Sequence, residues 1–131
     1  MITTRTALTT CLATALGLGL ALAPSAVASG GGVIRAAGSC SSGATWTLKA
    51  KHDAGVIEVE GQVDSNHAGQ SWKWRISDNG TVVRSGSATT TAPSGSFSVT
   101  RRIGNRAGVD HVVFRANRPA TGQTCRGSVT A

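Results

Sequence analysis

A two-residue alternation of apolar and polar side chains runs through most of this chain and limits what it can fold into. Trp46, Leu48 and Ala50 alternate with threonines and lysines, and Ile57 and Val59 alternate with glutamates. Successive side chains of an extended strand point to opposite faces, so this period predicts strands with one buried face, whereas a helix has a period near 3.6. Seven such strands are predicted, over residues 44–51, 57–64, 71–77, 81–87, 96–101, 110–117 and 124–130.

Short connections between these segments predict how the strands pair. Turn-forming residues separate them at intervals of about 8–12 residues, a spacing typical of sandwiches and barrels. Asp78-Asn79-Gly80 is one strong tight-turn signal. The connections are too short for helical crossovers, so the sheets are expected to be antiparallel. We therefore predict an all-β domain, with an additional short edge strand at Val33-Ile34-Arg35.

Parity restricts the register of the first predicted hairpin. Its inward residues are even-numbered on one strand and odd-numbered on the other. Opposed residue numbers must then add to an odd sum, because otherwise one strand would turn its apolar face to water. The short turn favours a sum of 107, which places Lys49 opposite Glu58, Leu48 opposite Val59 and Thr47 opposite Glu60.

The N-terminal residues have the order of a secretory signal peptide. Arg5 is followed by a long uncharged apolar run, and Ala26-Val27-Ala28 has the A-x-A form of a cleavage site. A transmembrane anchor is the alternative, but threonines and Cys11 interrupt the run and make it marginal for a span. We predict a secreted, extracellular product without a membrane span. The predicted divisions are a signal peptide over 1–28, a disulfide-pinned tail over 29–43 and a β-sandwich domain over 44–131.

Two cysteines, Cys40 and Cys125, remain after that cleavage. An even number in an exported protein predicts a disulfide bond. This bond would tie the start of the domain to its last strand, and it is worth about 4–5 kcal/mol in the chain-entropy model. A metal-binding or reactive pair is the alternative, but other ligands at metal-binding spacing are missing from the sequence around both cysteines.

The strand pattern resembles the immunoglobulin-like and fibronectin type III sandwiches, with Trp72 or Trp74 as the buried tryptophan of the third strand. The resemblance implies an antiparallel seven-stranded immunoglobulin-like sandwich. Its first, second and fifth strands would form one sheet, and its third, fourth, sixth and seventh strands the other. The chain departs from the immunoglobulin pattern because it has no tyrosine and because Cys40 precedes the first of these strands.

A second resemblance covers the whole precursor. It is to uncharacterised small secreted proteins of high-GC Gram-positive bacteria, and it implies export without assigning an activity or site residues. The segments that carry it are Trp46–Lys51, Ile57–Glu60, Ser94–Val99 and Thr121–Cys125.

Positive charge is expected to gather on one of the two sheets. The chain has 13 Lys and Arg residues against 6 Asp and Glu residues. Outward positions of the first sheet mix lysines with acidic residues, whereas those of the second sheet contain no acid. Guanidinium groups bind phosphate and carboxylate groups bidentately, so the second sheet predicts an anion-binding face; an ordinary solvated face is the alternative. The predicted face consists of Lys73, Arg75, Arg84, His111, Arg115 and Arg126.

This face favours a secreted, non-enzymatic binding or structural module. The expected partners are an anionic cell-wall polymer, lipid headgroups or an acidic protein. Nucleic acid is disfavoured, because no aromatic side chain lies between the cations of the face. The alternative is a secreted inhibitor or effector that binds a protein target through its loops, above all the connection at residues 88–93.

Catalytic and metal sites are not expected. Nucleophile-elbow motifs are missing, and Glu58 and Glu60, which could imitate a glycosidase pair, lie on one strand face opposite polar residues. His52-Asp53 and Asp110-His111 are adjacent pairs, whose side chains diverge in extended backbone. We therefore predict no catalytic residue, no metal and no cofactor. The tryptophans share the inward parity of their strands, so core packing is favoured over a carbohydrate platform.

Overall fold

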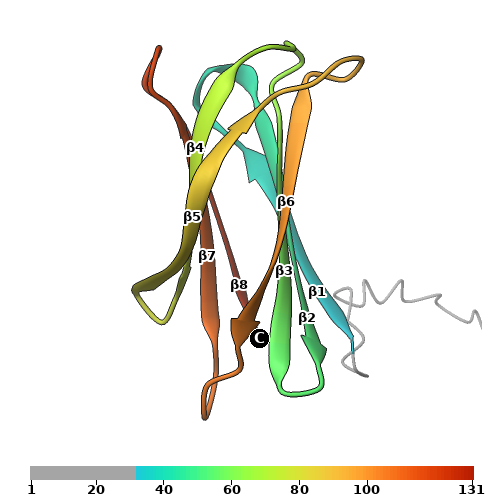
Figure 1. Ribbon diagram of the computed structural model, residues 1–131, viewed down its shortest axis with the longest axis vertical. Coiled ribbons are helices and arrows are strands. Elements are labelled where there is room, and N and C mark those ends of the chain that lie inside the picture. The colour runs from blue at the N-terminus through green and yellow to red at the C-terminus, as the bar shows by residue number, and fades with distance from the viewer. Residues whose placement is uncertain (1–31) are drawn as a thin grey trace, which may run out of the picture.

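The computed structural model describes residues 32–131, which form a β-sandwich of two four-stranded antiparallel sheets (Figure 1). The strand order is β1-β2-β3-β6 in one sheet and β5-β4-β7-β8 in the other. The predicted signal peptide and its cleavage site lie outside the described residues. The strands are β1 (Val33–Ser39), β2 (Thr45–Asp53), β3 (Val56–Asp64), β4 (Ser71–Asp78), β5 (Thr81–Thr89), β6 (Ser96–Gly104), β7 (His111–Arg118) and β8 (Gln123–Thr130), with a 3-10 turn, η1 (Ser41–Gly43), after β1.

The predicted division of strands between the sheets is confirmed, but the number of strands is corrected from seven to eight. The seven predicted strands correspond to β2–β8. The eighth is the predicted edge strand, which continues to Ser39 and pairs with β2 along its whole length, from Val33 opposite Lys51 to Ser39 opposite Thr45. Its second half consists of alanine, glycine and serine, so the sequence shows no apolar alternation there.

The register of the β2–β3 hairpin corrects one prediction. Opposed residues add to an odd number, as predicted, but Lys49 lies opposite Glu60 and not opposite Glu58. The sum is therefore two greater than predicted. Ala54 and Gly55 form the turn with φ values of 48° and 84°, and two-residue hairpin turns of this type require positive φ at both central positions. The predicted sum would have moved Gly55 out of the turn.

Inward-facing side chains from both sheets form one core. Trp72 and Trp74 of β4 are 1% and 2% exposed, so their predicted core positions are confirmed. Trp72 packs against Phe97 of the opposite sheet, and the centroids of the two rings are 6.1 Å apart. Trp46 is half-buried against the core. Its ring occupies the space beside Gly127 of β8, where a Cβ atom would lie 2.3 Å from a ring carbon.

The predicted disulfide bond between Cys40 and Cys125 is confirmed. Cys40 follows β1 and Cys125 lies on β8, so the bond joins the two sheets covalently. Disulfides of this kind are typical of proteins from oxidising compartments.

Within residues 32–131, no helix has the length and apolar character needed to span a membrane.

Candidate anion-binding face

Three arginines stand side by side on the outer face of the β5-β4-β7-β8 sheet. Arg75 of β4 lies directly opposite Arg115 of β7, and Arg115 lies directly opposite Arg126 of β8. All three side chains are exposed. Neighbouring strands are about 4.8 Å apart, so the three residues form a row that crosses the strands. We call Arg75, Arg115 and Arg126 the arginine row.

The arginine row lacks internal charge compensation. Like charges directly opposite each other on neighbouring strands destabilise a sheet. The ion pairs found within residues 32–131 join Lys49 to Glu60, Arg102 to Asp53 and Arg106 to Asp78, and none includes a member of the row. Outward positions of this sheet carry no acidic residue in the described part of the chain. An anion on this face would therefore relieve repulsion that the protein itself leaves in place.

A hollow of about 280 Å³ lies along the arginine row. All three arginines line it, together with His111, so four of the six predicted residues meet here. Val113, which lies between His111 and Arg115 on β7, is only 7% exposed and also lines the hollow. The remaining lining residues are Ser77, Gly80 and Val82. Cations therefore surround an apolar surface formed by Val82 and Val113. This apolar surface was not predicted from the sequence.

Lys73 and Arg84 complete the predicted set, but they lie outside this hollow. Lys73 is exposed on β4, opposite Asn117 of β7, and extends the basic surface beyond the row. Arg84 does not belong to the face, because a register shift in the β4–β5 pairing places it opposite the buried Ile76. Its guanidinium donates to the carbonyl oxygen of Val83 at 2.7 Å and to that of Arg102, on the other sheet, at 2.8 Å.

Arg84 thus lies at the edge of the sandwich where β5 and β6 face each other, and Arg101 lies at the same edge. The guanidinium carbon of Arg101 lies 5.0 Å from the centroid of the Trp74 ring, a distance at which a cation attracts an aromatic face. Arg84 and Arg101 therefore close the edge of the sandwich. The guanidinium groups at these two positions contribute to packing between the sheets. Of the two, only Arg84 was in the predicted set, so five of the six predicted residues remain candidates for anion binding.

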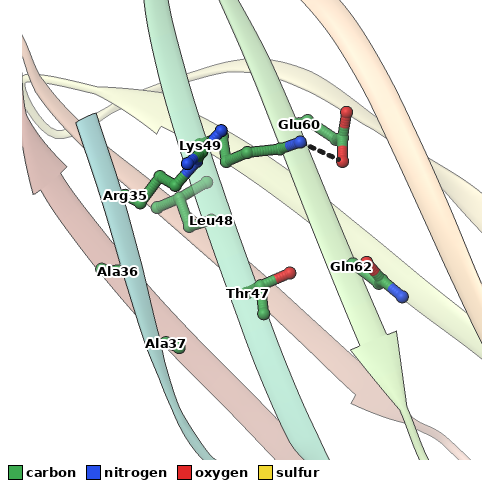
Figure 2. A pocket seen from close by; sticks show the side chains of 8 residues that line it. All are labelled: Arg35, Ala36, Ala37, Thr47, Leu48, Lys49, Glu60 and Gln62. Atoms are coloured by element: carbon green, nitrogen blue, oxygen red, sulfur yellow. Dashed lines mark ion pairs between the residues drawn. The ribbon is translucent and has the colours of Figure 1, made fainter. Parts of the chain in front are cut away.

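The outer face of the first sheet holds a hollow of about 390 Å³ with a different character. Lys49 Nζ lies 3.1 Å from Glu60 Oε1, and Figure 2 shows this pair reaching from β2 to β3 beside Arg35 of β1. The lysine charge is already paired inside the protein. This hollow mixes both signs of charge, as predicted for the first sheet, and does not select anions.

The connection between β5 and β6, which the alternative function would use, packs against a neighbouring turn. Thr90 is 2% exposed, and its hydroxyl donates to the carbonyl oxygen of His67 at 2.6 Å. Gly95 packs so closely on the backbone of residues 66–67 that a Cβ atom would lie 2.2 Å from the His67 nitrogen. The connection between β5 and β6 is therefore tied to the β3–β4 turn and does not stand out as a separate loop.

A polar cleft of about 620 Å³ lies at the same end of the sandwich. His67, Arg118 and Gln123 line it, but Gln123 donates to the carbonyl oxygens of Ser41 and Ser42 at 2.9 and 3.2 Å. Its amide thus fixes the turn after β1. Across residues 32–131, no group of three or more His, Cys, Asp or Glu side chains is placed to hold a metal ion.

The structure classifies the chain by architecture alone, as a β-sandwich of two four-stranded antiparallel sheets. The likeness to small secreted proteins of high-GC Gram-positive bacteria stays a prediction. Comparison of the chain with protein-family models, curated proteins and solved structures found no match.

Proposed function

We propose that this protein is a secreted, non-enzymatic, immunoglobulin-like binding module that holds anionic surface polymers on the outer face of its β5-β4-β7-β8 sheet. The observation that carries the proposal is the arginine row, in which Arg75, Arg115 and Arg126 stand in direct cross-strand register without an acidic neighbour on that face. Three like charges in register cost stability, and a bound polyanion would offset that cost.

The chemistry of the face favours phosphate or carboxylate groups. Guanidinium groups form paired hydrogen bonds with both, and the hollow along the row brings three of them around one volume. Val82, which is 52% exposed, also lines the hollow and supplies an apolar contact that a polymer with a carbon backbone can use. Candidate ligands are anionic cell-wall polymers, lipid headgroups and acidic proteins. Base stacking is not supported, because Trp72 and Trp74 point into the core.

Export and the immunoglobulin-like assignment have their own support. The Cys40–Cys125 disulfide suits an oxidising compartment. Strands β2–β8 are divided three and four between the sheets, which is the division expected from the resemblance to immunoglobulin-like and fibronectin type III sandwiches, with β1 added at one edge. The alternative, an inhibitor or effector that binds through its loops, is less favoured because the 90–95 connection is tied to its neighbours.

The test compares two double variants that remove equal charge from opposite faces. Arg75→Gln/Arg115→Gln disrupts the arginine row, whereas Arg35→Gln/Lys51→Gln removes two exposed cations of the β1-β2-β3-β6 sheet. Binding to poly(glycerol phosphate) is measured over a range of salt concentrations. We expect the first variant to bind about tenfold more weakly or worse, since each charged hydrogen bond is worth roughly 1.5–3 kcal/mol. The control variant should stay close to the wild type.

Equal weakening in the two variants would show that net charge, and not the face, drives binding. Two further probes separate the ligand sources: vesicles that contain phosphatidylglycerol, and polyglutamate. Binding of polyglutamate alone would indicate a carboxylate partner. The proposal would be contradicted if the wild type bound none of the three probes at low salt.

A further inference from the structure

Two carboxyl groups are buried together at one end of the sandwich. Asp78 is the last residue of β4 and Asp110 immediately precedes β7, and their exposed fractions are 1% and 0%. Asp110 is fixed by its main chain, whose N–H donates to the Ala131 oxygen at 2.9 Å and whose oxygen accepts from the Ala131 N–H at 2.8 Å. The adjoining turn is also rigid, because the Asn79 side chain bonds both Val109 and His111.

Arg106 contacts both carboxyl groups, one through its side chain and the other through its main chain. Arg106 Nε lies 3.5 Å from Asp78 Oδ2, and the Arg106 backbone N–H donates to Asp110 Oδ1 at 3.3 Å. The other two oxygens, Asp78 Oδ1 and Asp110 Oδ2, are buried and have no hydrogen-bond donor in the described part of the chain. The two carboxyl groups are close enough for Asp110 to raise the pKa of Asp78. Two ionised carboxylates in this position would leave two buried oxygens without partners and would repel each other.

A single proton resolves this arrangement. If one carboxyl group is protonated, its O–H donates to the oxygen of the other, and both orphaned oxygens gain a partner. The remaining negative charge is then matched by Arg106. We propose that Asp78 and Asp110 bind one shared proton in the folded protein, and that loss of this proton as the pH rises loosens the loop between β6 and β7.

The electrostatic surroundings agree with this assignment. Burial raises the pKa of Asp78 above the ordinary value of 3.8, and its hydrogen bond with Asp110 and the charge of Asp110 raise it further. The charge of Arg106 lowers the pKa of Asp78 and opposes these effects. Two histidines lie near this loop: the exposed His111 follows Asp110 directly at the start of β7, and the Nδ1 atom of His52 of β2 lies 3.3 Å from Asn105 Nδ2.

The sign of the pH effect follows from the raised pKa of Asp78. A carboxyl group that holds its proton more tightly in the folded state stabilises the fold fully below the unfolded pKa, here about 3.8. This stabilisation is lost as the pH rises from that value through the folded pKa. Within this window, the folding equilibrium constant falls by as much as about tenfold per pH unit for one proton.

The test measures the unfolding free energy of the full chain against pH for the wild type and for Asp78→Asn. The asparagine amide can donate permanently to Asp110 Oδ2, so the variant keeps the bond without a titrating proton. Its stability relative to the wild type should rise with pH, by up to about tenfold in the equilibrium constant per unit. The matched control is Asp53→Asn, which removes a 47% exposed carboxylate paired with Arg102. This control should not reproduce the rising difference.

Asp110→Asn is the second variant, in case Asp78→Asn does not fold, and it should give the same trend. Hydrogen exchange supplies a local measurement. The protection factor of the Arg106 amide should fall with rising pH in the wild type and stay constant in the asparagine variants. A pH-independent difference between wild type and both variants would overturn the proposal. So would a rise in wild-type stability on adding calcium chloride at alkaline pH that the variants lack, because a cation would then occupy the place of the proton.

Discussion

Removal of the disulfide is expected to lower the free energy of unfolding by about 4–5 kcal/mol, in a double variant Cys40→Ala/Cys125→Ala. The bond closes a loop with a sequence separation of 85 residues, and long loops lose the most chain entropy when cross-linked. Typical domains have a total stability of only about 5–15 kcal/mol, so the variant should be close to unfolding at physiological temperature. Urea denaturation followed by tryptophan fluorescence measures the change.

Reduction of the wild type provides the control for this prediction. The reduced protein should match the double variant in its urea midpoint, since both lack the cross-link and both keep the other core contacts. A loss smaller than about 1 kcal/mol would contradict this account, because the two sheets would then hold together by packing alone.

Replacement of Trp72 by alanine should destabilise the fold by about 3–5 kcal/mol, the range typical of a buried tryptophan. Trp72 is 1% exposed and packs against Phe97 of the opposite sheet. Its indole Nε1 also donates to Gln70 Oε1 at 3.4 Å. The large volume removed lies at the contact between the two sheets, so the cavity cannot close without moving one sheet toward the other.

Trp72→Phe is the matched variant, because it keeps an aromatic ring and loses mainly volume and the indole bond. It should cost clearly less than the alanine variant under the same conditions. If Trp72→Ala cost under about 1 kcal/mol, this position would not belong to the core that joins the sheets.

Side-chain alternation carries most of the fold because it is a local property. The strands and their buried faces followed from the inward parity of residues such as Leu48, Ile57, Trp74 and Phe114, all of which are buried. The division of the strands between the two sheets followed from the resemblance to immunoglobulin-like sandwiches and not from parity. Alternation fails where residues are small. Ala36, Ala37 and Gly38 show no contrast between faces, so the length of β1 depended on its pairing with β2 and could not be read from the sequence.

The position of Arg84 shows a second limit. Val82 and Val83 are adjacent valines, so either could face the core, and the sequence does not fix the phase of β5. The structure exposes Val82 and packs Val83 against the core, after which Arg84 lies opposite Ile76. A single irregularity in pairing thus removed one residue from the predicted face. The arginine row lies across the β4–β7 and β7–β8 pairings, which have no such irregularity, and there parity was sufficient.

The buried carboxyl pair could not be predicted from local sequence. Asp78 belongs to an Asp-Asn-Gly turn signal, and turn formation is a complete explanation for aspartate at that position. Its burial depends on Asp110 and Arg106, which lie about thirty residues further along the chain. Long-range pairing of strand ends, and not local propensity, brings the three side chains together.

The proposed function requires that anions bind at the arginine row. A nuclear magnetic resonance titration of the mature protein with inorganic phosphate, with the arginine Nε signals observed, tests it directly. We predict saturable shifts at Arg75, Arg115 and Arg126, accompanied by the Val113 amide in the adjoining hollow. Saturable shifts confined to Arg118 and the polar cleft, or shifts of equal size at all arginines, would contradict it.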